Sequence, residues 1–245
     1  MTGRSRVAGV GGLAMAIEQG LPAASGGASM TAQLFDRLRD DVLNGVLQPG
    51  QKLKIETLRE QYDVGASPVR EALSMLTAEG LVQRLDQRGF RVTEVSIGAF
   101  EELLRTRCWL EERALREAIA NGSNGWEESV LLAHHRLTRT PRSEGASARS
   151  TQAWEQAHRR FHMALLAACR SQFLIGYCGQ LYDLNIRYRN LAGAVAYPSR
   201  DVAREHQAIC DATLARDADR AVRLLIDHYT ATGDFLRLSL NDMAH

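Results

Sequence analysis

The chain has 245 residues, which is enough for one large domain or two small ones. Hydrophobic residues make up 45% of it and charged residues 24%, and the net charge is +1. No apolar run is long enough to span a membrane, which argues against a membrane protein. The four cysteines form no Cys-x-x-Cys pair, so we expect reduced thiols and a cytoplasmic protein.

The N-terminal segment is expected to be a disordered tail rather than a targeting segment. The stretch 7–24 is rich in Gly and Ala but only mildly apolar, and Glu18 and Gln19 interrupt it, which matches a signal peptide poorly. Met30 is an alternative start. We therefore divide the chain into a tail (1–29), a first domain (30–95) and a second domain (96–245).

The first domain opens with two predicted helices, over about 31–45 and 55–61. Gly45 and Pro49-Gly50 end the first helix and make a turn. Its buried stripe is predicted from four apolar residues at helical spacing, namely Leu34, Leu38, Val42 and Leu43.

A third helix is predicted to begin near Ser67, because Ser67 can cap a helix and Pro68 suits its first turn. Arg70 lies off the apolar stripe, close to the helix start, where a basic side chain can enter a DNA major groove. The alternative for Arg70 is a surface ion pair with Glu71 or Glu79. The stripe itself consists of Val69, Leu73 and Leu76.

A small hairpin follows the third helix. Gly80 ends that helix, and strands are predicted near 82–85 and 89–93 with Gly89 at the tip. Residues 31–94 contain nine Lys or Arg and ten Asp or Glu, so bulk charge does not favour DNA binding. The distribution does, because five arginines fall on the second helix, the third helix and the hairpin: Arg59, Arg70, Arg84, Arg88 and Arg91.

The second domain shows no strand pattern and is predicted to be an all-helical bundle. Ser96 is expected to cap its first helix. The predicted helices span about 97–121, 126–139, 151–169, 173–194, 200–215 and 218–240.

Four histidines lie on apolar helix faces of this bundle. His158 and His162 are four residues apart and share one face, and His206 and His228 each lie on the apolar stripe of a later helix. Neutral imidazole is a common ligand of zinc, nickel and similar ions. We therefore predict a divalent transition-metal site, and buried core histidines are the alternative.

Two arginines are candidates for binding an anion. Arg107 lies on an apolar stripe and needs a partner there. It either pairs with Glu111 four residues later or grips a carboxylate ligand, because a guanidinium matches a carboxylate bidentately. Arg187, on the fourth helix of this domain, is a second candidate for the same anion site, and a solvated surface position is its alternative.

Residues 31–94 resemble the winged helix-turn-helix of the GntR family of bacterial transcriptional regulators. The matching pieces are 45–50, Leu58-Arg59-Glu60, 64–73, Glu79-Gly80-Leu81-Val82 and Arg88-Gly89-Phe90-Arg91-Val92. The resemblance implies DNA contacts from Arg59, Ser67, Arg70, Arg88 and the wing residue Gly89. Ala66 stands where the family often has Arg, so the operator is expected to differ from the common one.

Residues from about 97 to 236 resemble the FCD-type effector domain of the FadR-like branch of that family. The matching pieces are Arg107-Cys108-Trp109-Leu110-Glu111, Phe161-His162, His206 and His228. The resemblance implies a divalent metal held by three of the histidines. His158 stands where such domains often have Asp, and a fourth imidazole favours softer metals such as zinc or nickel.

Taken together, the sequence predicts a mainly α-helical, ligand-responsive transcription factor and no enzyme. A homodimer is expected to bind a palindromic double-stranded DNA operator, and the bundle to sense a small carboxylate through the metal. Repression is the default expectation. Two alternatives remain open: a hydrolase-like enzyme that uses the histidine-bound metal, and a constitutive DNA binder with a degenerate effector site.

Overall fold

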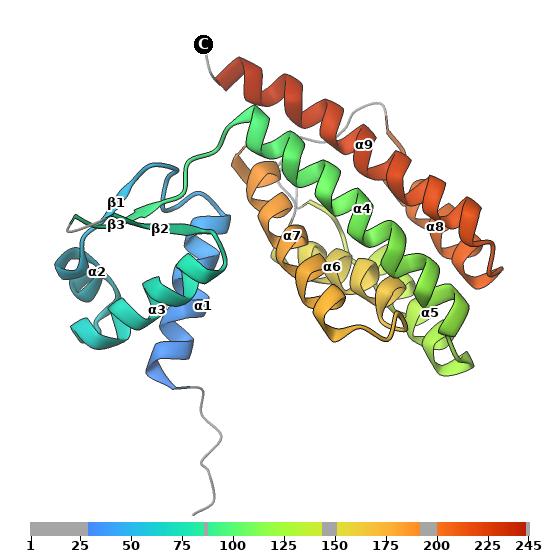
Figure 1. The fold of residues 1–245 in the computed structure, drawn as a ribbon, viewed down its shortest axis with the longest axis horizontal. Helices are drawn as coiled ribbons and strands as arrows, with labels where there is room; N and C mark the ends of the chain where they lie inside the picture. Colours follow the sequence, from blue (N-terminus) through green and yellow to red (C-terminus); the bar gives the residue numbers. More distant parts are fainter. Residues whose placement is uncertain (1–28, 86–87, 144–150, 192–199, 244–245) are drawn as a thin grey trace, which may run out of the picture.

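The computed structural model describes residues 29–85, 88–143, 151–191 and 200–243. The predicted tail, apart from Ser29, lies outside these residues. The described chain forms two lobes, a smaller N-terminal one with a sheet and a larger helical one (Figure 1). The predicted mainly helical fold, with a winged helix-turn-helix before a helical bundle, is confirmed.

The N-terminal lobe contains three helices and three short strands. The helices are α1 (Met30–Leu43), α2 (Ile55–Tyr62) and α3 (Ala66–Ala78). The strands β1 (Lys52–Leu53), β2 (Val82–Leu85) and β3 (Gly89–Val92) form an antiparallel sheet in the order β1-β3-β2. The sequence did not predict β1, because two residues are too few to show an alternating pattern. Pairing with β3 defines it, with Lys52 opposite Arg91 and Leu53 opposite Phe90.

The core of this lobe is apolar throughout. The helix α1 packs on α3, and the predicted stripes of both helices are buried. The predicted cap of α3 is wrong: Gly65 is the N-cap residue, and Ser67 lies inside the first turn with its Oγ bonded to Glu71 Oε1 at 3.2 Å. Pro68 therefore lies two residues deeper in the helix than predicted, at the third helical position, where its missing N–H is still not needed.

The C-terminal lobe is built from helices close to the predicted ones. Side-chain oxygens of Ser96, Ser123 and Thr151 cap three of them by accepting bonds from backbone N–H groups of the first turn. The prediction that Ser96 caps the first helix is thus confirmed. The helices are α4 (Ile97–Asn121), α5 (Asn124–Arg139), α6 (Gln152–Leu166), α7 (Gln172–Leu191), α8 (Val202–Leu214) and α9 (Ala218–Met243).

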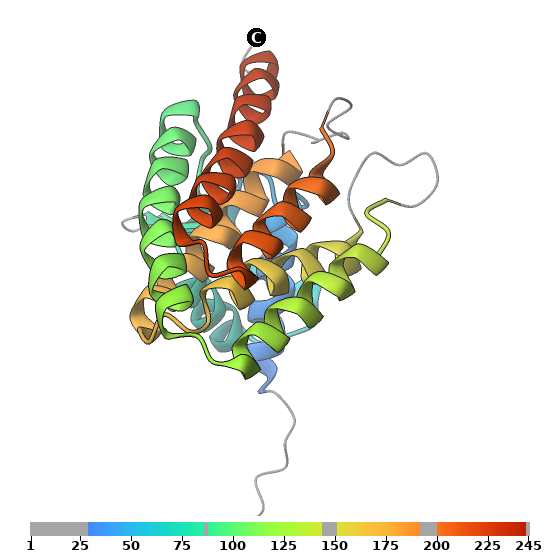
Figure 2. The ribbon, with the colours of Figure 1, turned by 90° about the vertical axis from the view of Figure 1, so that its right-hand side faces the viewer.

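The two longest helices, α4 and α9, lie side by side along the bundle (Figures 1 and 2). Gly233 permits this close approach, because a Cβ added there would lie 2.4 Å from Leu104 Cδ2. The bundle core includes the fully buried rings of Phe100 and Phe161. Within the described residues, no helix is both long and apolar enough to cross a membrane.

The lobes meet where α1 packs against α7. Leu184 of α7 contacts both hydrophobic cores. Asn190 Nδ2 donates to Leu43 O at 2.9 Å, and Arg39 of α1 forms an ion pair with Asp183 of α7. The N-terminal lobe is therefore attached to the bundle by specific polar contacts as well as by the linker before α4.

Candidate functional site

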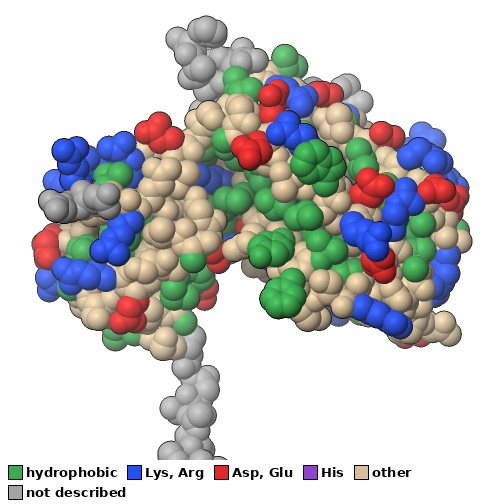
Figure 3. Space-filling view, viewed as in Figure 1, with side chains coloured by type: hydrophobic (Ala, Val, Ile, Leu, Met, Phe, Trp, Pro, Cys, Tyr) green, Lys and Arg blue, Asp and Glu red, His purple; other side chains and the backbone are tan. Residues whose placement is uncertain are grey.

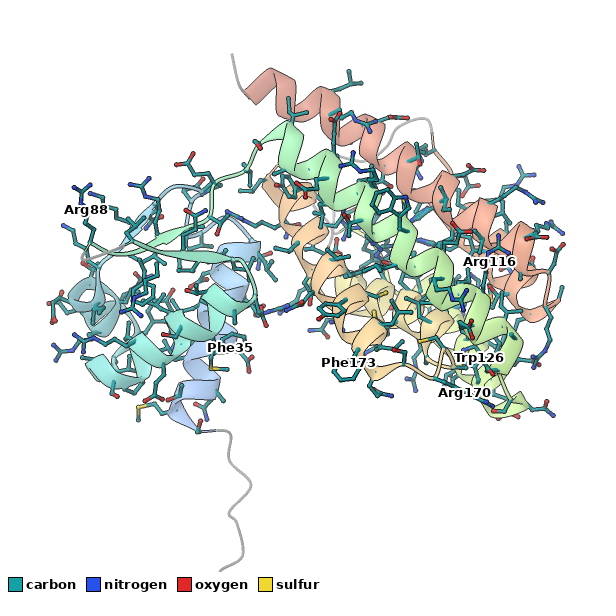
Figure 4. The ribbon with its side chains drawn as sticks, viewed as in Figure 1. Phe35, Arg88, Arg116, Trp126, Arg170 and Phe173 are labelled. Atoms are coloured by element: carbon teal, nitrogen blue, oxygen red, sulfur yellow. The ribbon has the colours of Figure 1, made fainter. Side chains whose placement is uncertain are left out.

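The first candidate site is the outer surface of the N-terminal lobe. Figure 3 shows Lys and Arg side chains gathered at the end of this lobe that lies away from the bundle. Arg88 extends from the wing at that end (Figure 4). Arg70 is exposed on α3, and Gly89 of the wing has a φ of 88°, which glycine adopts without strain. A cationic, protruding wing next to an exposed helix is suited to phosphate and groove contacts.

The five residues predicted to contact DNA are all exposed, but they differ in their partners. Arg59 forms an ion pair with Glu56 at 2.5 Å. The alternative ion pair of Arg70 is not formed among the described residues, because Glu71 bonds to Thr31 and Ser67, and Glu79 pairs with Arg39. Arg70 is thus available to a ligand without breaking an internal contact.

The second candidate site is the histidine cluster in the bundle. His158 and His162 come from α6, His206 from α8 and His228 from α9, and all four are buried. His158 Nε2 lies 3.2 Å from His206 Nε2 and 3.1 Å from His162 Nε2. One ring nitrogen from each of the four lies within 4.8 Å of the others. The helical spacing read from the sequence therefore brings these four side chains together.

Outer partners fix the orientation of three of these rings. His158 Nδ1 lies 2.5 Å from the hydroxyl of Tyr182, and His162 Nδ1 lies 2.9 Å from the hydroxyl of Tyr229. His228 Nδ1 lies 2.7 Å from Glu205 Oε2. Such contacts set the tautomer of a metal-binding histidine and turn its other nitrogen towards the ion. The sequence analysis missed these three partners, because periodicity gives the face of a residue but not its distant neighbour.

The electrostatics of the cluster suit a cation. Burial, and then the neighbouring imidazoles, hold the pKa values of His158, His162 and His206 well below the usual range, so these rings are neutral. Burial raises the pKa of Glu205, but its bonds to His228 and Arg200 outweigh this and lower it to about 2. A charged Glu205 can only accept a hydrogen bond, so His228 Nδ1 carries the proton and donates it in that bond, which leaves the Nε2 lone pair of His228 available.

The four-nitrogen donor set therefore fits a divalent transition metal. Neutral imidazole nitrogens suit zinc, nickel and copper, whereas magnesium and calcium prefer oxygen. A metal would lie among the Nε2 atoms. Glu205 and Tyr229 would not bind the metal directly, because they form hydrogen bonds with the Nδ1 atoms of His228 and His162.

Arg107 lies beside the cluster and forms the internal ion pair that was one of its two predicted alternatives. Its Nε pairs with Glu111 at 2.6 Å, as the internal alternative required, and its Nη1 bonds to Asn185 at 3.2 Å. Only 4% of the residue is exposed, yet its Nη2 has no hydrogen-bond partner among the described residues. Tyr229 links the two parts of the site, because its hydroxyl bonds to both Glu111 and His162. A buried guanidinium N–H without a partner in the described structure is able to donate a hydrogen bond to an anion.

Arg187 is not brought to the histidines. It is buried at the junction of the lobes, where its Nη2 donates to Thr93 O. Two residues further along α7, Arg189 lines the cavity beside the cluster and forms an ion pair with Glu155. Arg187 and Arg189 point differently because two residues on a helix are separated by about 200°.

Two cavities adjoin the histidines from different sides. One is water-sized, about 10 Å³, and is lined by residues that include Arg107, Arg189 and His228. The other has about 190 Å³ and is bounded by α5, α6 and α8, with Arg142, Trp154 and His206 in its walls. A larger groove of about 750 Å³ between α5 and α6 contains none of the four histidines, so it is not part of this site.

Comparison with protein families agrees with this architecture. The model of the bacterial regulatory proteins of the gntR family matches residues 30–92, and the FCD domain model matches residues 102–231. The chain is also 41% identical over 213 residues to the HTH-type transcriptional regulator BphR of Paraburkholderia xenovorans, covering 85% of this chain and 86% of that protein. The chain belongs to the GntR family. The predicted family and FCD-type effector domain are confirmed.

Other relatives extend this result. The GntR-family chain is 35% identical over 195 residues to the transcriptional repressor GlaR of Escherichia coli, covering 78% of this chain and 88% of that protein. The solved structure of McbR/YncC from Escherichia coli superposes with a TM-score of 0.70 at 21% identity and covers 86% of this chain and 99% of that one. This protein is thus a GntR-family DNA-binding transcriptional regulator with an FCD effector domain.

Proposed function

We propose that this regulator is a metal-dependent sensor of a small carboxylate. In this proposal it represses a catabolic operon by binding a palindromic operator as a cytoplasmic homodimer, and the carboxylate releases it. A ligand that binds one arrangement of the lobes more tightly than another shifts the protein towards that arrangement. The protein catalyses no reaction in this scheme.

One observation carries the proposal: four buried imidazoles converge beside a buried guanidinium that has a free N–H. Four neutral imidazoles offer nitrogens within 4.8 Å of one another, and Arg107 Nη2 has no hydrogen-bond partner in the described part of the chain. A bound carboxylate would offer one oxygen to the metal and the other to the guanidinium of Arg107. The cavity on the Arg107 side holds about 10 Å³, so binding there requires neighbouring side chains to move. Such a movement gives the ligand a means of selecting one state.

In this proposal the N-terminal lobe supplies the DNA contacts. Arg70 enters the major groove of the DNA, and Arg59 and Ser67 contact the DNA phosphate backbone. Arg88 and Gly89, which belong to the wing, approach the same DNA backbone. A second copy doubles these contacts, which offsets the modest net charge of a single lobe.

The exposed aromatic side chains of the bundle favour a second copy of the chain. Phe173 and Tyr177 on α7 are 83% and 58% exposed, and Trp109 on the adjacent α4 is 62% exposed. Figure 3 shows apolar side chains gathered on this face, and Figure 4 marks Phe173 at its edge. Large exposed apolar surface of this kind is typical of protein interfaces.

The test is metal analysis of the purified protein followed by thermal melting. We expect a stoichiometric transition metal in the wild type, and a rise in melting temperature with some members of a panel of short mono- and dicarboxylates that chelator abolishes. His206→Ala should weaken metal binding at least about tenfold. His135→Ala is the matched control, because His135 is exposed on α5 and lies outside the cluster.

Other outcomes would lead to the alternatives. Absence of metal in the wild type, with operator binding indifferent to every acid, would indicate a constitutive DNA binder. Metal-dependent turnover of an added ester or amide would indicate an enzyme. The carboxylates nearest the histidines do not favour an enzyme, since Glu205 and Glu111 are both engaged by basic side chains.

A further inference from the structure

A single buried carboxylate joins the two lobes. Asp183 of α7 is only 7% exposed and binds arginines from both sides. Arg39 of α1 reaches its Oδ2 through Nη2 at 2.5 Å. Arg159 of α6 donates to the same carboxylate, from Nε to Oδ1 at 2.8 Å and from Nη2 to Oδ2 at 3.2 Å. Charge-assisted bonds of this kind are strong and directional, so they fix relative position as well as adding stability.

On the DNA side, the contact continues to the helix that carries Arg70. The Nε atom of Arg39 bonds to Glu79 Oε2 at 2.8 Å, and Glu79 is the C-cap residue of α3. One guanidinium thus connects the end of α3 to the bundle. A shift of Asp183 would change the position of α3, because α1 and α3 also pack on each other as a unit.

On the bundle side, the same turn of α7 reaches the histidine cluster. Tyr182 precedes Asp183, and its hydroxyl lies 2.5 Å from His158 Nδ1. Arg159 follows His158 on α6 and is paired with Asp183. Two successive residues of α6 are thereby matched with two successive residues of α7. His158 and Asp183 are therefore connected through neighbouring residues on both helices.

From this arrangement we propose that Asp183 is a positioning residue, which sets the placement of the DNA-binding lobe on the bundle and makes it depend on the state of His158. The inference rests on the proposed metal site, since an ion bound by His158 Nε2 fixes the ring that Tyr182 contacts. Asp183 touches neither DNA nor metal. Its role is to join two elements whose arrangement both ligands bias.

The junction has other contacts, but they lie outside this connection. Arg187 holds the backbone of Thr93, and Asn190 holds Leu43 and Asn44. None of these residues touches a histidine of the cluster through a described contact. They provide a constant attachment, whereas Asp183 provides the ligand-dependent one.

The test is hydrogen–deuterium exchange of the full chain with zinc ion or with chelator. In the wild type we expect amides of α1 and of the C-terminal half of α3 to exchange at least about threefold more slowly with zinc. Asp183→Asn should exchange faster in α1 and lose the zinc effect, and Asp183→Glu should restore part of it. Asp219→Asn is the control, because Asp219 pairs with Arg116 on an exposed surface of the bundle. If Asp183→Asn fails to fold, Arg39→Gln tests the same contact from the other lobe.

Zinc titration calorimetry separates this inference from the proposed function. If zinc binds the wild type but α1 exchange is the same with zinc and with chelator, the coupling through Asp183 is overturned and the metal site stands. If zinc does not bind, both the metal site and the ligand-dependent role are overturned. An unchanged zinc response in Asp183→Asn also overturns the inference.

Discussion

The two lobes differ in whether their polar side chains are buried or exposed. Within the described part of the chain, every buried polar or charged residue belongs to the bundle, whereas the core of the N-terminal lobe is apolar. The N-terminal lobe keeps Arg59, Arg70 and Arg88 exposed. The bundle buries Arg107, Glu111 and four histidines among aromatic rings.

This difference matches the sizes of the ligands proposed for the two lobes. A nucleic acid is a large polyanion that stays in water, so the charges that contact it must be exposed and close to their final positions. A small ligand is bound with most of its surface buried, so its site must hold polar groups away from water and satisfy them internally. In the proposed function, one chain thus has an exposed surface for DNA and an enclosed site for a small ligand.

The largest expected effect comes from breaking the buried ion pair of the bundle. Glu111→Ala leaves Arg107 buried without its carboxylate, and we expect a loss of about 3–5 kcal/mol in the free energy of unfolding. Denaturant unfolding followed by tryptophan fluorescence measures this loss in the right lobe, because Trp109, Trp126 and Trp154 all lie in the bundle.

The matched control is Glu117→Ala on the same helix. Glu117 pairs with Arg113 at 2.5 Å, but the side chains are 35% and 71% exposed, so the cost should stay below about 1 kcal/mol. Equal costs for the two substitutions would contradict the contrast between buried and exposed pairs.

The next effect is a pH dependence confined to the bundle. Burial holds the pKa values of His158, His162 and His206 below their unfolded value near 6.5, so the unfolded chain binds protons more readily. The free energy of unfolding is therefore unaffected by these histidines above that pH, and it decreases as the pH is lowered below it. In the presence of chelator, going from pH 7.5 to 5.5 should cost up to about 1.4 kcal/mol per histidine.

The N-terminal lobe supplies the internal control, because residues 29–96 contain no histidine. Amide exchange in α3 should keep its protection over this pH range after correction for the intrinsic rate, while protection in α8 falls. A parallel loss in both lobes would mean that they unfold as one unit and would remove the basis of the comparison.

The smallest of the three effects concerns DNA affinity alone. Arg70→Ala should weaken binding by about 1–3 kcal/mol if Arg70 reads a base, with bundle stability unchanged within about 0.5 kcal/mol. A DNA fragment enriched by in vitro selection with the wild type is a suitable probe, and Arg113→Ala on the bundle is the control. Unchanged affinity would remove Arg70 from the contact set.

The sequence predicted local structure well, because capping residues and apolar spacing act within a few residues. Ser96 caps α4 as expected, and the i,i+4 spacing of His158 and His162 turns both inward. Apart from the N-cap of α3, which is Gly65 and not Ser67, its errors concern partners that are far away in the chain. The sequence placed Arg187 near the anion site, but its guanidinium bonds to the carbonyl of Thr93 instead. The helical spacing of apolar residues does not show which distant residue packs against a given position.

The outer partners of the histidines show the same limit. Glu205 directly precedes His206 on α8, yet its hydrogen bond is with His228 on α9. Tyr182 and Tyr229 carried no sequence signal beyond an apolar position. Asp183 lies 144 residues from Arg39, so only the packing of α7 against α1 reveals their contact.

The depth of the histidine cluster also sets a rate. The four histidines are between 1% and 6% exposed, so in the proposed sensor an ion or acid reaches all four ring nitrogens only when the surrounding side chains move. Arrival and departure must wait for the helices to separate briefly, and the frequency of that opening limits both steps. We therefore expect the proposed sensor to respond slowly, to retain what it has bound and to average over brief fluctuations in supply.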